Sequence, residues 1–261
     1  MDFQILHFYP DLMNLYGSYA NVSVLARLLE CLGHTATVMA IHPGEGAINP
    51  AETAKVGETA ENDGPALLSH ADFVYMGAGT ERRQRFAMED FARYSEAVKA
   101  AVGDGVPMLF AGTAMELLGE SVTTADGEMF AGIGLSGFTT VQGRRRIVGD
   151  VYGHTDLFPE SIVGFMNKSA VIAGIDTPLI NSLNLGFGNE AERGPEGFRQ
   201  GNIFGSELTG PILVKNPRLL ETIAAAMLKR RGIDPPPAFP LDEWALKGYA
   251  VTERELQLRC Q

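Results

Sequence analysis

Hydrophobic and polar positions follow two alternating patterns along this chain of 261 residues. Short apolar runs of the kind that form buried strands are separated by longer segments in which apolar residues recur at helical spacing. Turn-forming glycine, proline, serine and asparagine lie between the two kinds of segment. The pattern predicts strands at residues 3–9, 35–41, 71–76 and 106–111.

Helices are predicted between these strands and towards the C-terminal end. The first has valine and leucine at helical spacing from Val22 to Leu32, with Asn21 as its N-cap and Gly33 at its C-terminal stop. Pro217 lies near the start of the last helix, where a proline is tolerated. Further helices are expected after the third strand as far as residue 102, at 115–118 and at 219–231.

Strands that alternate with helices indicate a parallel sheet covered on both faces, with ligand chemistry at the carboxyl ends of the strands. Two strand-end loops therefore matter most: Gly77–Gly79 after the third strand and Gly112–Ala114 after the fourth. After Gly119 the pattern changes to short β-like segments with many glycines, such as 146–151 and 170–175. A more antiparallel flank is expected there.

The chain is expected to form a single domain over residues 1–232. Three consecutive prolines at 235–237 stop the last helix, so residues 233–261 are expected to be a proline-rich linker and a tail that packs on the domain or on a partner. Residues 43–65 are rich in Gly, Ala, Glu and Pro, and they predict a loop or insertion with or without a short helix.

The net charge of the chain limits the kinds of molecule that it is expected to bind. The net charge of −11 argues against nucleic acid or anionic lipid, because a protein that binds the phosphate backbone needs a basic field. The chain starts without a basic leader, and no apolar run reaches the roughly 20 residues of a membrane span. We therefore expect no membrane span and a cytoplasmic location.

The sequence offers no motif for a metal or a cofactor. Cys31 and Cys260 form neither a metal-ligand spacing nor a disulfide framework. A phosphate-binding loop of the type G-x-x-x-x-G-K-[ST] is absent, so ATP chemistry by this chain is not expected.

Four segments, in order, carry a resemblance to a known family. They are YPDLMNLYGSYANV (9–22), MGAGTERRQ (76–84), PMLFAGTAMELLG (107–119) and GSELTGPILVKNP (205–217), supported by GFMN (164–167) and LGFGN (185–189). Together they resemble the glutaminase subunits of lipid II isoglutaminyl synthases (the GatD family), which are related to the amidotransferase domains of cobyric acid synthases. The resemblance implies a class I glutamine amidotransferase-like (flavodoxin-like) three-layer sandwich, with a largely parallel central sheet and an antiparallel flank.

The resemblance also implies a chemistry whose two central residues are missing. Such enzymes use a cysteine thiolate at a strained strand-to-helix turn and a histidine that takes and returns its proton. Against the family pattern P-x-L-x-x-C-G-G-x-Q-L-L-G, the cysteine position is Gly112, and against G-T-Y-L-H-G-P the histidine position is Thr209. All five histidines precede that segment. Loss of both groups predicts that glutamine is not hydrolysed by this route.

Other residues near these motifs have both a binding and a structural interpretation. Thr113 is a weak substitute nucleophile, because the sequence offers no adjacent base. The glycine-rich loop either presents backbone N–H groups to a ligand or simply forms a tight turn. Arg146 matches the family position associated with the carboxylate of glutamine, and it could equally be a solvated arginine of a hairpin. The candidate ligand-binding residues are Gly77, Ala78, Gly79, Arg146, Asn167 and Asn189, although turn-forming asparagines are common.

Three functional hypotheses follow. The leading one is an amidotransferase-like subunit without glutaminase activity that pairs, as a heterodimer, with a Mur-ligase-like synthetase and has room for a small glutamine-like ligand. The alternative is an active glutamine-hydrolysing subunit with relocated catalytic groups, which supplies ammonia for the amidation of peptidoglycan glutamate or of cobyric acid. A third is a different activity that uses Thr113, Glu116 or the arginines of 144–146.

Overall fold

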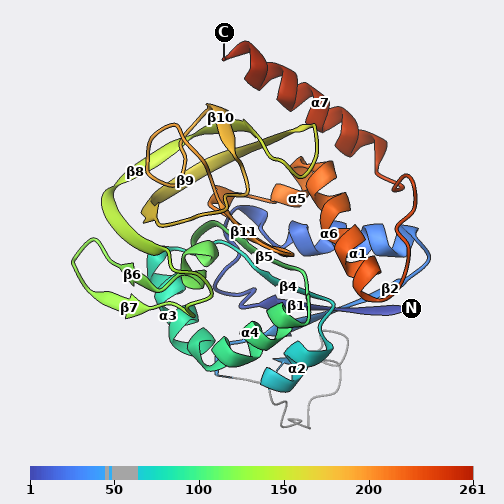
Figure 1. The fold of residues 1–261 in the computed structure, drawn as a ribbon, viewed down its shortest axis with the longest axis horizontal. Coiled ribbons are helices and arrows are strands. Elements are labelled where there is room, and N and C mark those ends of the chain that lie inside the picture. Colours follow the sequence, from blue (N-terminus) through green and yellow to red (C-terminus); the bar gives the residue numbers. More distant parts are fainter. Residues whose placement is uncertain (45–46, 49–63, 261) are drawn as a thin grey trace.

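The central sheet has seven strands in the order β11-β12-β5-β4-β1-β2-β3, in a computed structural model that describes residues 1–44, 47–48 and 64–260 (Figure 1). The inner strands pair in parallel, and each edge strand pairs antiparallel with its neighbour. The four predicted strands are all present. The members are β1 (Asp2–Phe8), β2 (Thr35–Ile41), β3 (Ala47–Ile48), β4 (Phe73–Met76), β5 (Met108–Ala111), β11 (Phe198–Gln200) and β12 (Ile203–Ser206).

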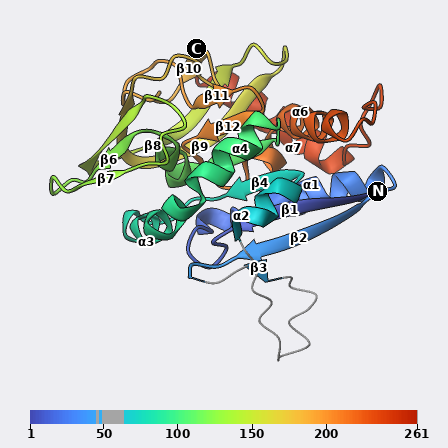
Figure 2. The same cartoon turned by 60° about the horizontal axis from the view of Figure 1, so that its bottom comes forward.

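Alternate side chains of the inner strands enter two separate hydrophobic cores. In β1, Phe3 and Ile5 join the core under α1 and α6, whereas Leu6 and Phe8 join the core under α3 and α4. A strand that is apolar on both faces suits a parallel sheet between two layers of helices, and Figure 2 shows these layers. The helices are α1 (Ala20–Cys31) and α6 (Pro217–Arg230) on one face, and α2 (Gly64–His70), α3 (Glu81–Phe91) and α4 (Ser95–Gly103) on the other.

The long polar helix that the sequence predicts is broken. A 3-10 turn, η2 (Ala92–Tyr94), separates α3 from α4. The break lets Tyr94 turn inward, where its buried ring meets that of Phe8 edge-on at 5.1 Å between centroids. Packing of one aromatic residue therefore overrides the helical pattern.

The prediction of Asn21 as an N-cap is wrong. The N-cap position of α1 is Tyr19, and Asn21 lies inside the first turn, fully buried. Its Oδ1 accepts a hydrogen bond from the backbone N–H of Leu213 at 2.8 Å, and its Nδ2 donates to Tyr75 Oη at 2.8 Å. The amide thus joins α1 to a distant segment, which a local pattern does not reveal.

The antiparallel flank is a second sheet in the order β13-β9-β8-β6-β7, with β10 paired to β8. Its centre is the long β8–β9 hairpin, in which the register shifts between Gln142 and Ile147. Residues 143–146 therefore form a bulge opposite Ser169, and this bulge carries the three consecutive arginines. The strands are β6 (Ser121–Thr123), β7 (Met129–Ala131), β8 (Thr139–His154), β9 (Ser161–Ala173), β10 (Ser182–Leu185) and β13 (Leu208–Thr209).

The C-terminal helix α7 (Glu243–Leu258) lies against β8 and β9 (Figure 1). Leu256 packs with Tyr152 and Val163, and Ser161 Oγ donates to Glu253 Oε1 at 2.5 Å. A short helix, α5 (Ile212–Lys215), precedes α6. No helix of the described residues combines the length and the apolar character needed to cross a membrane.

Candidate functional site

A narrow crevice lies at the carboxyl ends of β4, β5 and β12. Leu15 and Tyr16, from the segment that follows β1, form another part of its wall. The free space within it measures about 10 Å³, which is on the order of one water molecule. Segments far apart in sequence therefore converge where an α/β sheet binds its ligands. The lining residues are Leu15, Tyr16, Ala78, Gly79, Gly112, Thr113, Arg146, Asn167, Lys168, Glu207 and Thr209.

Gly112 forms a sharp elbow between β5 and the 3-10 helix η3 (Gly112–Leu118). Its φ of +60° lies in the left-handed region that favours glycine. A Cβ at this position would lie 2.5 Å from Cβ and 3.2 Å from Cα of Ala78. The elbow that the resemblance implies is present, but in this structure it has no room for a side chain.

The second residue of the glycine-rich loop causes this crowding. The resemblance of residues 76–84 to the family's glycine-rich loop, G-G-G-Q-D-x-E-Q, implies a second glycine where this chain has Ala78. The methyl group of Ala78 occupies the space above Gly112. Gly77 serves packing, since a Cβ there would lie 2.5 Å from both the carbonyl oxygen of Met13 and the hydroxyl of Ser18. Gly77 is therefore required for close approach of two backbone segments.

Thr113 ties the loop to the elbow. Its hydroxyl donates to the carbonyl oxygen of Gly79 at 3.1 Å and accepts from the N–H of Gly79 at 3.0 Å. Gly79 N–H, which the sequence offered as a donor to a ligand, is thus already hydrogen-bonded. Gln84 Nε2 donates to the Thr113 carbonyl oxygen at 2.7 Å and fixes the turn further.

Thr209 lies in the same crevice as Gly112, so the structure brings together the two positions that the resemblance assigns to the cysteine and the histidine. Thr209 is buried on β13, and its hydroxyl donates to the carbonyl oxygen of Phe165 at 3.1 Å. No histidine lines the crevice in the described part of the chain. The crevice therefore presents no imidazole that could take a proton from Thr113.

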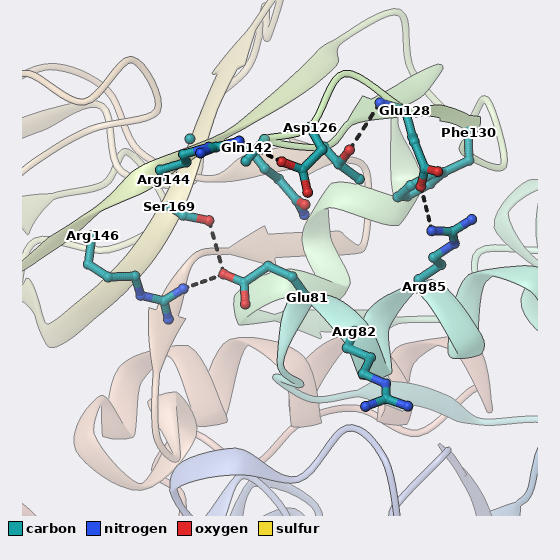
Figure 3. A pocket seen from close by; sticks show the side chains of 13 residues that line it. Glu81, Arg82, Arg85, Asp126, Glu128, Phe130, Gln142, Arg144, Arg146 and Ser169 are labelled. Carbon is teal, nitrogen blue, oxygen red and sulfur yellow. Dashed lines mark hydrogen bonds and ion pairs between the residues drawn. The ribbon is translucent and has the colours of Figure 1, made fainter.

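Arg146 and Asn167 close the mouth of the crevice. Arg146 Nε donates a hydrogen bond to Asn167 Oδ1 at 2.9 Å. The Arg146 guanidinium also forms an ion pair with Glu81, and Glu81 accepts a hydrogen bond from Ser169 Oγ at 2.9 Å (Figure 3). Asn167 Nδ2 in turn donates to the hydroxyl of Tyr16 at 2.9 Å. Both predicted residues are present at the site, but their polar groups bind each other.

Asn189 does not lie in the crevice, contrary to the prediction. Its amide exchanges two hydrogen bonds with the backbone of Gly197, at 2.9 and 3.0 Å. The side chain is turned into the protein, where it holds a turn.

The sequence analysis did not identify the two buried charged residues of the crevice, Lys168 and Glu207. Lys168 Nζ lies 2.6 Å from Glu207 Oε2, and the two side chains are 3% and 1% exposed. Lys168 also donates to the carbonyl oxygens of Gly188 at 2.7 Å and Asn189 at 3.1 Å. The available signal was a single charge inside each of two otherwise uncharged β segments, MNKSAV and FGSELT.

Two further buried carboxyl groups lie around this pair. Burial, with a contribution from the charge of Glu207, raises the pKa of Glu116 to about 8. Glu116 Oε2 accepts a hydrogen bond from Gln142 Nε2 at 2.8 Å. Burial also raises the pKa of Glu196 to about 7, although the backbone N–H of Glu207 donates to its carboxylate at 2.7 Å. The interior near the crevice thus holds two carboxyl groups whose pKa values burial raises well above the usual range.

A wider cleft of about 450 Å³ lies beside the crevice and shares Arg146 with it. It runs between α3, the β6–β7 hairpin and β8 (Figure 3). Opposite charges pair within it: Arg85 with Glu128 at 2.5 Å and Arg144 with Asp126 at 2.8 Å. Within the described residues, no group of three or more His, Cys, Asp or Glu could hold a metal ion.

Comparison with known proteins gives the family of this chain. Residues 4–217 match the model of the CobB/CobQ-like glutamine amidotransferase domain. The chain is 28% identical over 229 residues to the lipid II isoglutaminyl synthase (glutamine-hydrolyzing) subunit GatD of Staphylococcus aureus (strain N315), covering 88% of this chain and 86% of that protein. It is 29% identical over 232 residues to the subunit GatD of Streptococcus pneumoniae (strain ATCC BAA-255 / R6), covering 87% of this chain and 81% of that protein.

A solved structure supports the fold. The glutaminase domain of Trypanosoma brucei CTPS with bound acivicin superposes with a TM-score of 0.52 at 10% identity, covering 91% of this chain and 96% of that one. The match is to a mixed α/β glutaminase fold, as the topology above and the family match require. The chain therefore belongs to the family of CobB/CobQ-like glutamine amidotransferase domains.

Proposed function

We propose that this chain is the amidotransferase-like subunit of a lipid II isoglutaminyl synthase-type complex and that it does not hydrolyse glutamine. Its relatives in two species are named as GatD subunits of that synthase. The proposed partner is a Mur-ligase-like synthetase, which would carry out the ATP-dependent activation that this sequence lacks a phosphate-binding loop to perform.

The observation that carries the proposal is the contact between Ala78 and Gly112. A nucleophile at the elbow needs a Cβ, and that atom would lie 2.5 Å from the methyl carbon of Ala78. Two substitutions thus act together: glycine removes the thiol, and alanine fills the space that the thiol would need. Restoring the cysteine alone would meet a steric conflict.

The remaining parts of the crevice support the same proposal. Thr209 supplies no base, and the N–H of Gly79 is hydrogen-bonded to Thr113. A cavity of about 10 Å³ is far too small for glutamine, since small-molecule sites measure about 300–1,000 Å³. The crevice thus lacks a nucleophile and a base, its candidate oxyanion donor is already hydrogen-bonded, and it has no space for the substrate.

The experiment is an amidation assay with the chain and its Mur-ligase-like synthetase purified together. Lipid II, ATP and either glutamine or ammonium chloride are supplied, and amidated product is measured by mass spectrometry. The proposal predicts product with ammonium and none above background with glutamine. The Staphylococcus aureus GatD with its own synthetase is the positive control for glutamine, because it is named as a glutamine-hydrolysing subunit. Product from glutamine at a rate comparable to the control would refute the proposal.

A further inference from the structure

We propose that the Mur-ligase-like synthetase binds one face of this chain, which runs from the outer side of α7 to the mouth of the crevice. Five side chains, each at least half exposed, define this docking face: Trp244, Val251 and Leu258 of α7, Val148 of β8, and Tyr16 of the crevice wall. The inference rests on the proposed function, which supplies the partner. It goes further by assigning the surface that the partner covers.

Helix α7 lies at the outside of the molecule and is apolar on two opposite sides (Figure 1). Its inner side packs on the β8–β9 hairpin, where Leu256 is buried. On its outer side, Trp244, Val251 and Leu258 are exposed and follow one another at intervals of seven residues, which is about two helical turns. The three side chains therefore form one stripe. A helix that covers its own domain with one side and exposes an apolar stripe on the other is suited to lie between two proteins.

The stripe continues onto the β8–β9 hairpin. At the C-terminal end of α7, Arg259 forms an ion pair with Asp150 of β8. Val148 lies two residues from Asp150 and therefore on the same side of the strand. Val148 is paired with Asn167 of β9, and Asn167 Nδ2 donates to Tyr16 Oη at 2.9 Å. The docking face thus leads from α7 across the hairpin to the mouth of the crevice.

The area of the stripe shows that α7 is one part of a larger contact. The stripe runs from Trp244 to Leu258, about 21 Å at a rise of about 1.5 Å per residue, and a helix is about 10 Å wide. A contact through α7 alone therefore covers on the order of 200 Å², whereas a stable interface covers about 800 Å² per partner. A partner that binds stably must also cover the hairpin and the crevice mouth.

The charge of the chain opposes a second copy as this partner. Each copy carries a net charge of −11, so two copies repel each other. The docking face also ends at the crevice, the site that the resemblance assigns to amide chemistry, and amidation is the reaction of the proposed complex. The synthetase is therefore the partner that this position fits.

The charges of α7 argue against a lipid surface as the occupant. An amphipathic helix that binds anionic lipid is rich in lysine and arginine on its polar side. Helix α7 instead carries three glutamates against one lysine and one arginine. The exposed stripe thus fits the surface of a protein better than that of an anionic membrane.

The test titrates the full chain with the Mur-ligase-like synthetase of the same organism in isothermal titration calorimetry. Val251→Glu places a charge at the centre of the stripe, and Trp244→Ala removes its largest side chain. Val148→Glu changes the hairpin and leaves α7 as it is. Each of the three variants should weaken the affinity by about tenfold or more. Phe86→Glu is the control, because it changes an exposed aromatic residue of α3, on the face of the central sheet opposite α1 and α6, and it should bind as the wild type does.

The three changed side chains are exposed, so the variants should unfold at the same temperature as the wild type. If Val251→Glu fails to fold, Val148→Glu decides the question, because its change lies outside α7. Wild-type affinity in the folded variants overturns the inference. Two other results also overturn it: a dimer of this chain that Val251→Glu converts to monomers in sedimentation velocity, or binding to phosphatidylglycerol vesicles that Val251→Glu abolishes.

Failure of this inference is distinguishable from failure of the proposed function. If the variants bind the synthetase as tightly as the wild type does, the docking face is wrong and the proposed function stands. If the chain hydrolyses glutamine while the variants bind weakly, the proposed function is wrong and the docking face stands. A wild-type chain that forms no complex with the synthetase contradicts both.

Discussion

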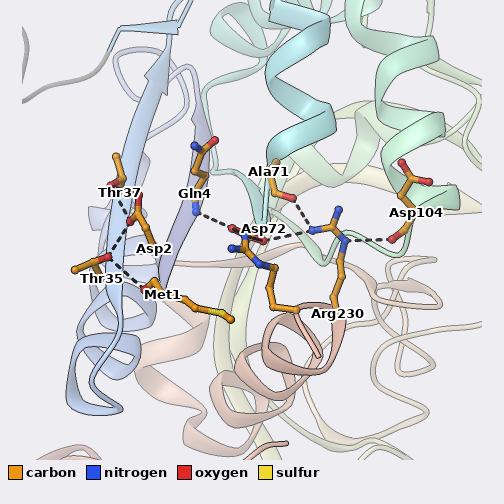
Figure 4. Close-up of polar contacts among 10 residues, drawn as sticks. Met1, Asp2, Gln4, Thr35, Thr37, Ala71, Asp72, Asp104 and Arg230 are labelled. Carbon is orange, nitrogen blue, oxygen red and sulfur yellow. Dashed lines mark hydrogen bonds and ion pairs between the residues drawn. The ribbon is translucent and has the colours of Figure 1, made fainter. Parts of the chain in front are cut away.

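The two ends of the central sheet each bury a carboxylate beside basic side chains, and they treat it differently. At the amino end, Asp72 is saturated: it accepts from Gln4 N at 2.9 Å, from Arg231 Nη1 at 2.9 Å to each oxygen, and from Arg230 Nη1 at 3.4 Å (Figure 4). Arg230 also donates to the carbonyl oxygens of Ala71 at 3.0 Å and Asp104 at 3.1 Å. This cluster fastens the end of α6 to the sheet.

At the carboxyl end, Glu207 has a single charged partner in contact, Lys168, among the described residues, and both of its carboxylate oxygens are buried. A saturated carboxylate stabilises the fold and leaves nothing for a ligand. A buried carboxylate with one charged partner depends on that partner to offset its charge. The comparison therefore separates an amino end whose buried carboxylate is held by several donors from a carboxyl end whose buried carboxylate depends on one charged partner.

The largest expected loss of stability comes from breaking the Lys168–Glu207 ion pair at the carboxyl end of the sheet. Lys168→Met leaves the charge of Glu207 buried and without its partner, so we expect a loss of about 3–5 kcal/mol in the free energy of unfolding. The double variant Lys168→Met/Glu207→Leu should recover most of it. Urea denaturation measures both, and Lys99→Met, which breaks the exposed pair of α4 with Glu96, is the matched control with no measurable change. A single variant as stable as wild type would show that the pair is not buried as described.

The second effect concerns the elbow. Gly112→Cys combines a left-handed backbone with crowding against Ala78, and we expect a cost of about 2–4 kcal/mol. Adding Ala78→Gly should remove the part of this free-energy cost that comes from crowding against the Ala78 methyl group. Gly127→Cys is the control, because Gly127 has a φ of +85° with nothing within 4 Å of an added Cβ. Equal costs at Gly112 and Gly127 would contradict the steric account.

Asp72→Asn tests the amino end. The change weakens charge-assisted hydrogen bonds, but Arg230 and Arg231 are 22% and 36% exposed and regain water, so we expect a smaller loss of about 2 kcal/mol. Denaturation in urea again gives the value. Asp126→Asn, at an exposed pair with Arg144, should leave stability unchanged. A loss at Asp72 larger than that at Lys168 would reverse the contrast between the two ends.

The smallest effect is the pH dependence of stability. Because the pKa of Glu116 is raised from 4.5 to about 8 on folding, the folded state binds more protons between these values, and the free energy of unfolding falls as pH rises through this window. Glu116→Gln should flatten the profile, by less than about 1.4 kcal/mol between pH 7 and pH 8. Glu96→Gln should keep the slope of the wild type. An unchanged slope in Glu116→Gln would show that this group stays ionised in the folded protein.

Much of the parallel sheet could be predicted because its strands are apolar on both faces. β2 has the predicted bounds, Thr35–Ile41, and the loops after β4 and β5 lie at the site as expected. Gly112 and Thr209 converge because each follows the end of a strand whose position the motifs fix. Local pattern and fold agree in this part of the chain.

The remainder depends on contacts that no local pattern encodes. Lys168 and Glu207 meet only because β13 pairs with β9, in the register Leu208 to Met166. Asn189 was expected at the ligand site, but its side-chain amide forms two hydrogen bonds with the backbone of Gly197 instead. The closing role of Ala78 required coordinates, since an alanine in place of a glycine is unremarkable in sequence.

The most direct test of the central claim is hydrolysis of amide-¹⁵N glutamine by the purified chain, with and without its synthetase, followed by the appearance of ¹⁵NH₄⁺. Because Gly112 offers no thiol and Thr209 no imidazole, the release of ¹⁵NH₄⁺ should equal that of a protein-free blank. Turnover above the blank that a cysteine-directed glutamine analogue abolishes would contradict the account.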